Sequence, residues 1–252
     1  GEYTFTLFAV IAVAMLVSWV VAVLFAPVIG VHILSANVKP HNAEPGRIGR
    51  MELRNRIVMA PMGSNFAESD GTCGERIQAY YEARARGGAG LLIMGVCAVA
   101  YPAGTAEPYQ VGVSHDDFIP GLARVAERAH RHGARIAMQL QHAGKTATRD
   151  MAEGRPLWVP SIPHATRTTM MVAFTPEEMA TFVGALGRQK PQHKVMDKAD
   201  IEQAIEWFAA AAQRAQQAGF DGVELHAAHT YLLAGFLSPH YNQRDDEYGG
   251  PL

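Results

Sequence analysis

Cysteine is scarce in this sequence: its 252 residues include only Cys73 and Cys97. Two cysteines provide neither a disulfide framework nor the four ligands of a structural zinc site. An excess of charge of one sign is also lacking, because 22 basic and 24 acidic residues leave a net charge of −2. A nucleic-acid partner is therefore not predicted, and we expect a small-molecule ligand and a reducing, cytoplasmic setting.

Charged side chains are absent from residues 5–34, which contain no Lys, Arg, Asp or Glu. About 30 residues at about 1.5 Å per residue are enough to cross a bilayer core of about 30 Å. Basic residues follow, beginning with Lys39 and Arg47, and the positive-inside rule places what comes after the segment in the cytoplasm. We predict a transmembrane-type helix over residues 1–36, which would anchor the protein in the inner membrane, and a linker over 37–46.

The same apolar segment, GEYTFTLFAVIAVAMLVSWVVAVLFAPVIGVHIL, resembles one transmembrane helix of the resistance-nodulation-division efflux pumps. The resemblance leaves an alternative open, in which a fragment of an efflux transporter is fused by accident to a non-catalytic partial barrel. A single helix cannot transport a substrate, because the substrate path of such a pump lies between several helices. A plain membrane anchor is the other interpretation.

Apolar runs and helical patterns alternate after Pro45, which predicts parallel strands joined by helices. The predicted strands are continuous apolar runs, at residues 56–62, 90–99, 134–142 and 220–226. The predicted helices lie between them, at residues 75–86, 116–131 and 200–217. The fold class is therefore predicted to be α/β, the N-terminal half (strands 1–4) of a TIM (β/α)8 barrel.

Two further helix starts are predicted in the long connection between the third and fourth strands. One is at Thr175, which is followed by Pro and Glu, and the other is at Asp197. They predict an extra helix or an insertion there. We also expect His142, Gly144 and Lys145, which follow the third strand, to form an exposed loop.

The fourth predicted strand ends in GVELHAAHTYL, at the edge where functional residues of a barrel lie. If the chain turns helically after His226, His229 lies on the same face, so both imidazoles can reach one carbonyl oxygen. Such donors would polarise a conjugated double bond, and Tyr231 could then protonate the α carbon. A structural pair of histidines is the alternative. A zinc site is not predicted, because the H-E-x-x-H pattern lacks its glutamate here.

Small or polar residues occupy the other strand ends. Glu224 lies two residues before His226 on the same strand face, where it orients an imidazole or fills a polar layer of the barrel. Gln139 binds either a side chain of a neighbouring strand or the pyrimidine ring of a flavin. Residues 60–63, Ala-Pro-Met-Gly, leave room for a flat ring.

Five ordered blocks, LRNRIVMAPM, GLLIMGVCAV, IAMQLQHAGK, GFDGVELHAAHTYLLAGFLSP and NQRDDEYGG, resemble the old yellow enzyme family. The resemblance is to its NADH:flavin oxidoreductase and 2-enoate reductase-like branch, and it covers residues 47–252. It implies a partial FMN-binding barrel there. It also implies that NADH or NADPH reduces the FMN, which then passes a hydride to the C=C bond of an α,β-unsaturated carbonyl or enoate.

The resemblance also implies roles for individual residues. His226 and His229 would bind the substrate carbonyl, and Tyr231 would be the proton donor, so these three are the predicted catalytic residues. The residues implied to contact FMN are Ala60, Pro61, Met62, Gly63, Val96, Gln139 and His226. No metal is implied, because Cys73 and Cys97 do not match the cysteines of the branch that carries an iron-sulfur cluster.

The family's later strands, which supply its phosphate-binding backbone, are not among these residues. The resemblance also places a Thr or Cys at the position of Gly63, which has no side chain to adjust the flavin. Half a barrel exposes two sheet edges and an open core, which predicts poor stability. We therefore expect this chain to be inactive alone.

Overall fold

The computed structural model describes residues 44–163, 175, 177 and 191–250. Its contacts divide the chain into two units, residues 1–43 and 44–252. The predicted transmembrane helix lies outside the described residues. Within the described ranges, no helix is long and apolar enough to cross a membrane. Of the helix start predicted at Thr175, only that residue and Glu177 are described.

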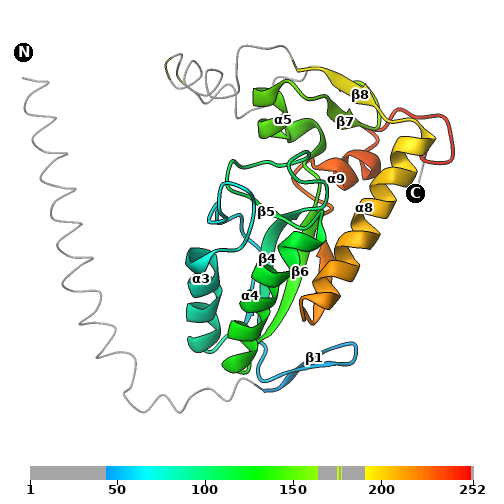
Figure 1. Cartoon of the computed structure of the whole chain (residues 1–252). Helices are drawn as coiled ribbons and strands as arrows, with labels where there is room; N and C mark the ends of the chain where they lie inside the picture. Colours follow the sequence, from blue (N-terminus) through cyan, green and yellow to red (C-terminus); the bar gives the residue numbers. More distant parts are fainter. Residues whose placement is uncertain (1–43, 164–174, 176, 178–190, 251–252) are drawn as a thin grey trace, which may run out of the picture. The chain divides into compact units, whose positions relative to one another are not determined.

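A sheet of parallel strands forms the centre of the second unit (Figure 1). Its hydrogen-bonded order is β3 (Val58–Met59), β4 (Leu91–Ala98), β6 (Arg135–Gln141) and β9 (Gly222–Leu225). A short strand, β5 (Val111–Gly112), pairs with the end of β4. Each of the four main strands lies beside the next one along the chain, as in a barrel, so the predicted arrangement of four strands is confirmed, although each strand is shorter than expected.

Helices connect these strands and cover one face of the sheet (Figure 1). They are α3 (Glu75–Arg86), α4 (Ile119–Arg131) after the 3-10 turn η2 (Asp116–Phe118), and α8 (Lys198–Gln217), while α9 (Leu232–Leu237) follows β9. Helix α3 has the predicted bounds. The start predicted at Asp197 is confirmed by a capping box, in which the Asp197 carboxylate accepts from the Asp200 N–H at 2.8 Å and the Asp200 carboxylate accepts from the Asp197 N–H at 3.1 Å.

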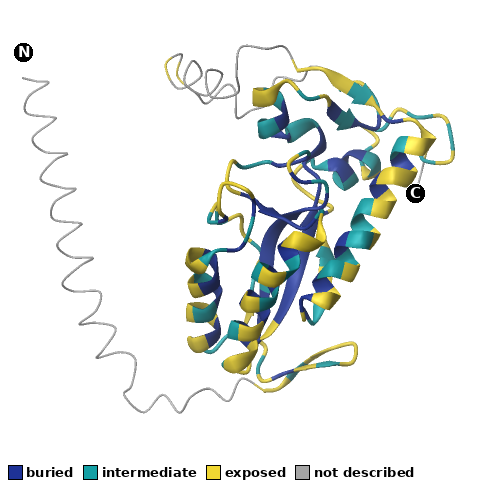
Figure 2. Cartoon of the chain, in the orientation of Figure 1, coloured by how far each residue is buried: buried dark blue, intermediate teal, exposed yellow. Residues whose placement is uncertain are grey.

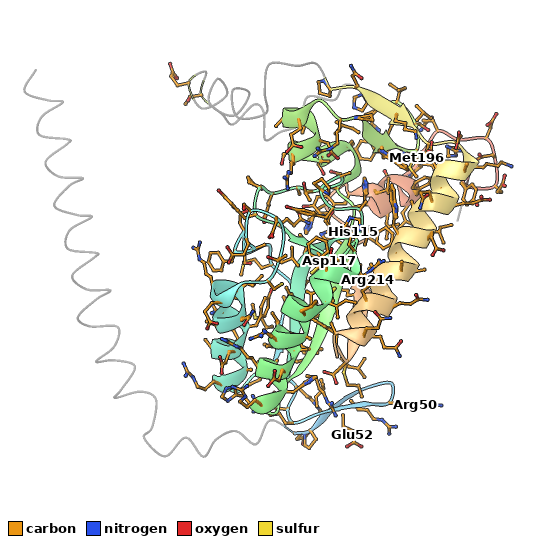
Figure 3. All side chains as sticks on the ribbon, viewed as in Figure 1. Arg50, Glu52, His115, Asp117, Met196 and Arg214 are labelled. Atoms are coloured by element: carbon orange, nitrogen blue, oxygen red, sulfur yellow. The ribbon has the colours of Figure 1, made fainter. Side chains whose placement is uncertain are left out.

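The apolar core lies between this helical layer and the sheet, where Figure 2 shows the buried residues of β4 and β6. Its largest fully buried side chains come from both layers: Ile77, Tyr81, Leu92, Met94, Leu122, Ile136, Met138 and Leu140. Each such aliphatic side chain contributes about 1.5–3 kcal/mol through burial. An ion pair between Arg214 and Asp116, 2.7 Å from Nε to Oδ1, joins α8 to the turn before α4. Figure 3 labels Arg214 on α8 and, on either side of Asp116 in the chain, His115 and Asp117.

A β-hairpin precedes the sheet. It begins at Gly46, the last residue of the predicted linker, and the sequence did not predict it. Its antiparallel strands are β1 (Gly46–Ile48) and β2 (Met51–Leu53). Leu53 is buried with Leu91 and Ala137, which lie near the starts of β4 and β6. The hairpin therefore covers the N-terminal ends of these strands, opposite the edge at which the functional residues are predicted.

The connection from β6 to α8 contains the predicted insertion. Its described part contains η3 (Gly144–Thr146), α5 (Thr148–Glu153), β7 (Leu157–Val159) and β8 (His193–Val195). The last two strands form a separate parallel pair. The sequence did not indicate these strands, because each has only three residues and no alternation long enough to recognise.

The prediction of an exposed loop after the third strand is wrong for His142 and Gly144, because both residues are buried. The His142 imidazole stacks on Trp207 of α8, with the ring centroids 5.8 Å apart and the planes 1° from parallel. Its Nδ1 accepts a hydrogen bond from the Gly144 N–H at 3.1 Å. Burial lowers the pKa of His142 to about 4, so the ring is neutral. The indole of Trp207 covers His142, which the local sequence had predicted to be exposed to solvent.

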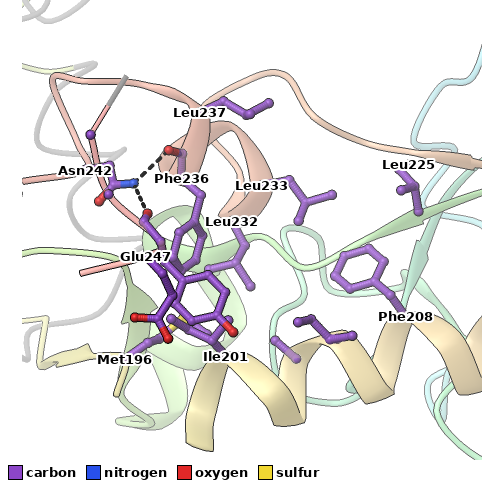
Figure 4. A pocket seen from close by; sticks show the side chains of 15 residues that line it. Met196, Ile201, Phe208, Leu225, Leu232, Leu233, Phe236, Leu237, Asn242 and Glu247 are labelled. Atoms are coloured by element: carbon purple, nitrogen blue, oxygen red, sulfur yellow. Dashed lines mark hydrogen bonds between the residues drawn. The ribbon is translucent and has the colours of Figure 1, made fainter. Parts of the chain in front are cut away.

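An apolar cavity of about 510 Å³ lies between α8, β9 and α9 (Figure 4). Asn242 closes one side of it by donating from Nδ2 to the carbonyls of Phe236 and Tyr248, at 2.9 and 2.7 Å. Leu225 and Leu237 line the cavity and are largely exposed. None of the predicted site residues lines it, so this cavity is distinct from the candidate active site.

Candidate active site

A second cavity, of about 430 Å³, lies at the C-terminal ends of the parallel strands. Every predicted site residue except Ala60 lines it: Pro61, Met62, Gly63, Val96, Gln139, His226, His229 and Tyr231. Four residues that were not among the predicted ones complete the lining: Glu107, Glu224, Ala227 and Ala228. The tertiary structure thus brings together residues that are up to 170 positions apart in the chain, from 61 to 231.

The segment after β3 passes very close to β4. Gly63 forms a bridge to Gly95, and a Cβ atom added to Gly95 would lie 2.7 Å from the Pro61 Cβ. A side chain at position 95 would therefore push residues 61–63 away from the sheet. Val96, the next residue of β4, is buried and contributes an apolar wall to the cavity.

Gln139 of β6 is paired in register with Glu224 of β9. The Gln139 Nε2 donates to the Glu224 Oε1 at 3.1 Å. A contact with a side chain of a neighbouring strand was one of the two alternatives predicted for Gln139. Glu224 thus orients Gln139 rather than an imidazole. The other carboxylate oxygen of Glu224 is buried and has no hydrogen-bond partner among the described residues, so it can accept from a bound ligand.

His226 and His229 are hydrogen-bonded to each other, with 3.1 Å between the His226 Nε2 and the His229 Nδ1. The His226 Nδ1 accepts from the Ala228 N–H at 3.3 Å. Burial, followed by the proximity of His229, lowers the pKa of His226 and favours its neutral form. A neutral ring with an acceptor at Nδ1 carries its proton at Nε2. His226 therefore donates to His229, and the free N–H of the pair is at the His229 Nε2.

The chain between these histidines does not turn as a right-handed helix, so this part of the expectation is wrong. His229 and Thr230 have φ angles of 52° and 59°, in the left-handed region, and α9 begins only at Leu232. The Ala228 N–H, which a helix would direct backwards along the chain, instead bonds to the His226 ring. Both imidazoles nevertheless line the same cavity.

Tyr231 completes this group immediately before α9. Its ring lies 4.5 Å from that of His226, centroid to centroid, with the planes tilted by 33°. Burial raises the pKa of Tyr231, and the negative charge of Glu107 raises it further. The phenol is therefore protonated at neutral pH, in the state required of a proton donor.

Glu107 is the functional candidate that sequence reasoning missed. It lies in the loop between β4 and β5, where GTAEP reads as an ordinary turn. The signal that could have found it is a carboxylate in a loop on the C-terminal side of a barrel strand. Burial raises the pKa of Glu107, and its Oε2 has no hydrogen-bond partner among the described residues.

The residues of this cavity fit a flat ring that carries hydrogen-bonding groups on its edge. Pro61 and Val96 supply apolar surface, the Gln139 amide offers a donor and an acceptor, and the buried Glu224 Oε2 needs a donor. A parallel β/α sheet with such a cavity, two histidines and a protonated tyrosine at its strand ends has the architecture of a barrel-type flavin oxidoreductase site.

Comparisons with known proteins agree with this class. Residues 43–252 match the model of the NADH:flavin oxidoreductase / NADH oxidase family. The chain is 40% identical over 212 residues to an NADH oxidase of Thermoanaerobacter brockii, covering 84% of this chain and 29% of that protein. It is 39% identical over 201 residues to an NADPH dehydrogenase of Halalkalibacterium halodurans, covering 79% of this chain and 52% of that protein.

Solved structures show the same likeness. Old yellow enzyme from Pichia sp. AKU4542 has a TM-score of 0.69 at 30% identity, over 83% of this chain and 52% of that one. Morphinone reductase in complex with tetrahydroNAD has a TM-score of 0.67 at 30% identity, over 84% of this chain and 56% of that one. The described sheet therefore corresponds to part of an old yellow enzyme barrel.

The chain belongs to the NADH:flavin oxidoreductase / NADH oxidase family. The predicted cofactors, FMN with NADH or NADPH as the reductant, are confirmed as those of the family and of its old yellow enzyme neighbours. The chain spans 29% and 52% of the lengths of the two relatives named above.

Proposed function

We propose that this protein is an FMN-dependent oxidoreductase that transfers a hydride from NADH or NADPH to the C=C bond of an α,β-unsaturated carbonyl compound. The observation that carries the proposal is the meeting of His226, His229 and Tyr231 in one cavity with Gln139. Family membership supports the redox part of the proposal. The histidines and the tyrosine support the substrate part.

FMN, when bound, supplies the hydride that reaches the β carbon of the substrate. The His229 Nε2–H is free to donate to the substrate carbonyl oxygen, where negative charge grows during the reaction. His226 holds His229 in the tautomer that offers this proton, and it becomes a second donor if the substrate oxygen replaces the bond between the two rings. Tyr231, protonated within the cavity, donates its proton to the α carbon.

The charge of the cavity favours a neutral carbonyl group over the carboxylate of an enoate. Glu107 and Glu224 both line it, and no Lys or Arg does so within the described part of the chain. A substrate carboxylate there would meet like charges in a partly desolvated space without a cation to offset them. We therefore propose enones and enals as the preferred substrate class.

The test uses the protein purified from its complete gene, with loss of cyclohexenone measured beside oxidation of NADH and NADPH. We expect a yellow, FMN-containing protein that reduces the enone. The double variant His226→Ala and His229→Ala should still accept electrons from the nicotinamide but reduce the enone at least about 100-fold more slowly, because the donors to the oxyanion are gone. An unchanged rate of enone reduction would show that the carbonyl does not bind to this pair.

We propose further that residues 5–34 anchor the protein in the inner membrane with the barrel in the cytoplasm. The uncharged run and the basic residues that follow it support this orientation. A single reading frame through residues 34–50 in the source genome, with the gene product in the membrane fraction, is the expected result. Separate genes at this position would instead show that the segment is a junction artefact.

A further inference from the structure

Strand β4 contains a bulge where it reaches the candidate active site. The register between β4 and β6 shifts between Met94 and Cys97. Gly95 and Val96 of β4 therefore stand opposite a single residue of β6, Gln139. Such a bulge takes backbone groups out of the regular ladder of hydrogen bonds. It lies at the wall of the cavity, because both Val96 and Gln139 line the cavity.

Gly95 is the point at which several of the predicted FMN contacts meet. It forms a bridge to Gly63. A Cβ atom added to it would lie 2.7 Å from the Pro61 Cβ, 2.9 Å from the Met62 N and 3.1 Å from the Gln139 Oε1. Because Gly95 has no side chain of its own, its position depends on what holds its backbone. A shift of this backbone would displace the residues that pack on it.

The hydroxyl of Tyr81, a residue of α3, holds the backbone of Gly95. The Gly95 N–H donates to the Tyr81 Oη at 3.3 Å, and this hydrogen bond is buried. Tyr81 is fully buried, and its ring packs edge-to-face on that of Tyr80, with the centroids 5.1 Å apart. The packed ring keeps the hydroxyl in place. Without the hydroxyl, a buried N–H would lose this acceptor, which is unfavourable unless the backbone moves.

We propose that Tyr81 is a positioning residue of the FMN site. Its hydroxyl holds the bulge of β4 from the helical layer, and the bulge sets where residues 61–63, Val96 and Gln139 stand around the cavity. Tyr81 does not line the cavity itself, so it acts through Gly95. The inference rests on the proposed function, in which FMN occupies this cavity.

The test compares FMN binding by the apo form of the complete gene product and of its variants. Tyr81→Phe removes the hydroxyl but keeps the ring. The bulge then relaxes in the free protein and must be restored when FMN binds. We expect the Kd for FMN to rise about tenfold, which corresponds to about 1.4 kcal/mol.

Two control variants lie in the same helix. Tyr80→Phe makes the same chemical change at the preceding residue, whose ring packs on Phe66, and it should leave the Kd unchanged. Ile77→Val removes a methylene group from a fully buried side chain. It should lower the stability of the protein through the core, again without a change in the Kd. The second control therefore separates loss of positioning from loss of stability.

Hydrogen exchange followed by mass spectrometry tests the step between the hydroxyl and the cavity. In Tyr81→Phe the amides of residues 91–98 should exchange faster than in the wild type, because the Gly95 N–H has lost its acceptor. In Tyr80→Phe they should exchange at the wild-type rate. A raised Kd with unchanged exchange in this strand would contradict the inference, because the effect would not pass through the bulge.

Two further outcomes decide against a positioning role. The inference fails if Tyr81→Phe binds FMN with the wild-type Kd, or if Ile77→Val raises the Kd by the same factor. A wild-type Kd in Tyr81→Phe beside a raised Kd in Gln139→Ala would count against this inference alone. Neither measurement uses an enone, so a failure of the carbonyl donors assigned in the proposed function would leave this inference intact.

Discussion

The His226 Nε2 and the His229 Nδ1 lie 3.1 Å apart and share one proton, which the backbone N–H of Ala228 assigns to His226. The pair therefore presents one free donor, at the His229 Nε2, rather than two equivalent ones. This asymmetry gives the two histidines different roles. In the proposed function, His229 would contact the substrate, and His226 would fix the tautomer of His229.

Replacement of His229 should separate these roles. His229→Ala removes the free donor, and we expect kcat for enone reduction to fall about 100-fold. His229→Gln restores an N–H at a similar distance from the backbone and should recover part of the loss. The check is steady-state kinetics with cyclohexenone, with nicotinamide oxidation by the same variants as the control. Equal activity of the Ala and Gln variants would contradict the donor role.

Loss of the Gln139 amide should weaken FMN binding. Gln139→Ala removes both a donor and an acceptor from the cavity and leaves Glu224 without its partner, so we expect the Kd for FMN to rise about tenfold or more. Quenching of flavin fluorescence measures it. Gln213→Ala, on an exposed position of α8, is the matched control. An unchanged Kd in Gln139→Ala would remove this residue from the cofactor site.

The buried His142 should make the protein less stable in acid. Its pKa is lowered from 6.5 to about 4 by burial, so the unfolded chain binds a proton in this range that the native state does not. The contribution to stability is therefore present above pH 6.5 and is lost as the pH falls towards 4. The slope is about 1.4 kcal/mol per pH unit, or about 3 kcal/mol over the window.

Urea unfolding at several pH values measures this effect, with tryptophan fluorescence as the probe because Trp207 stacks on His142. His142→Asn keeps an acceptor for the Gly144 N–H and should flatten the dependence between pH 6.5 and 4. His240→Asn, at an exposed position, should retain the slope of the wild type. If His142→Asn kept the full wild-type dependence of stability on pH, a group other than His142 would be responsible for it.

The acidic lining of the cavity should set the preference for substrate charge. We expect cinnamaldehyde to be reduced with a higher kcat/KM than cinnamate at pH 7, because Glu107 and Glu224 repel a carboxylate. Glu107→Gln should reduce the ratio of the two kcat/KM values, because removing the charge raises kcat/KM for cinnamate. The measurement is a competition between the two compounds in one reaction. Preference for cinnamate in the wild type would show that a cation outside the described residues reaches the site.

Regular elements of the fold could be predicted because their patterns are local. The helix at Glu75–Arg86 and the capping box at Asp197 were recognisable from a few neighbouring residues. The β7–β8 pair and the buried position of His142 were not, because both depend on partners far along the chain. A three-residue strand and a histidine after a strand carry no local sign of what will pack on them.

The sequence by itself determined which side chains stand at the strand ends, since the order of β/α units places 61–63, Gln139 and His226 on one edge. Only the tertiary structure decided how they are used. Strand register bonded Gln139 to Glu224, the non-helical chain after β9 brought His229 to His226, and a close approach at Gly63 admitted Glu107. These outcomes follow from distances between segments that are remote in the chain, and such distances are set by packing rather than by local pattern.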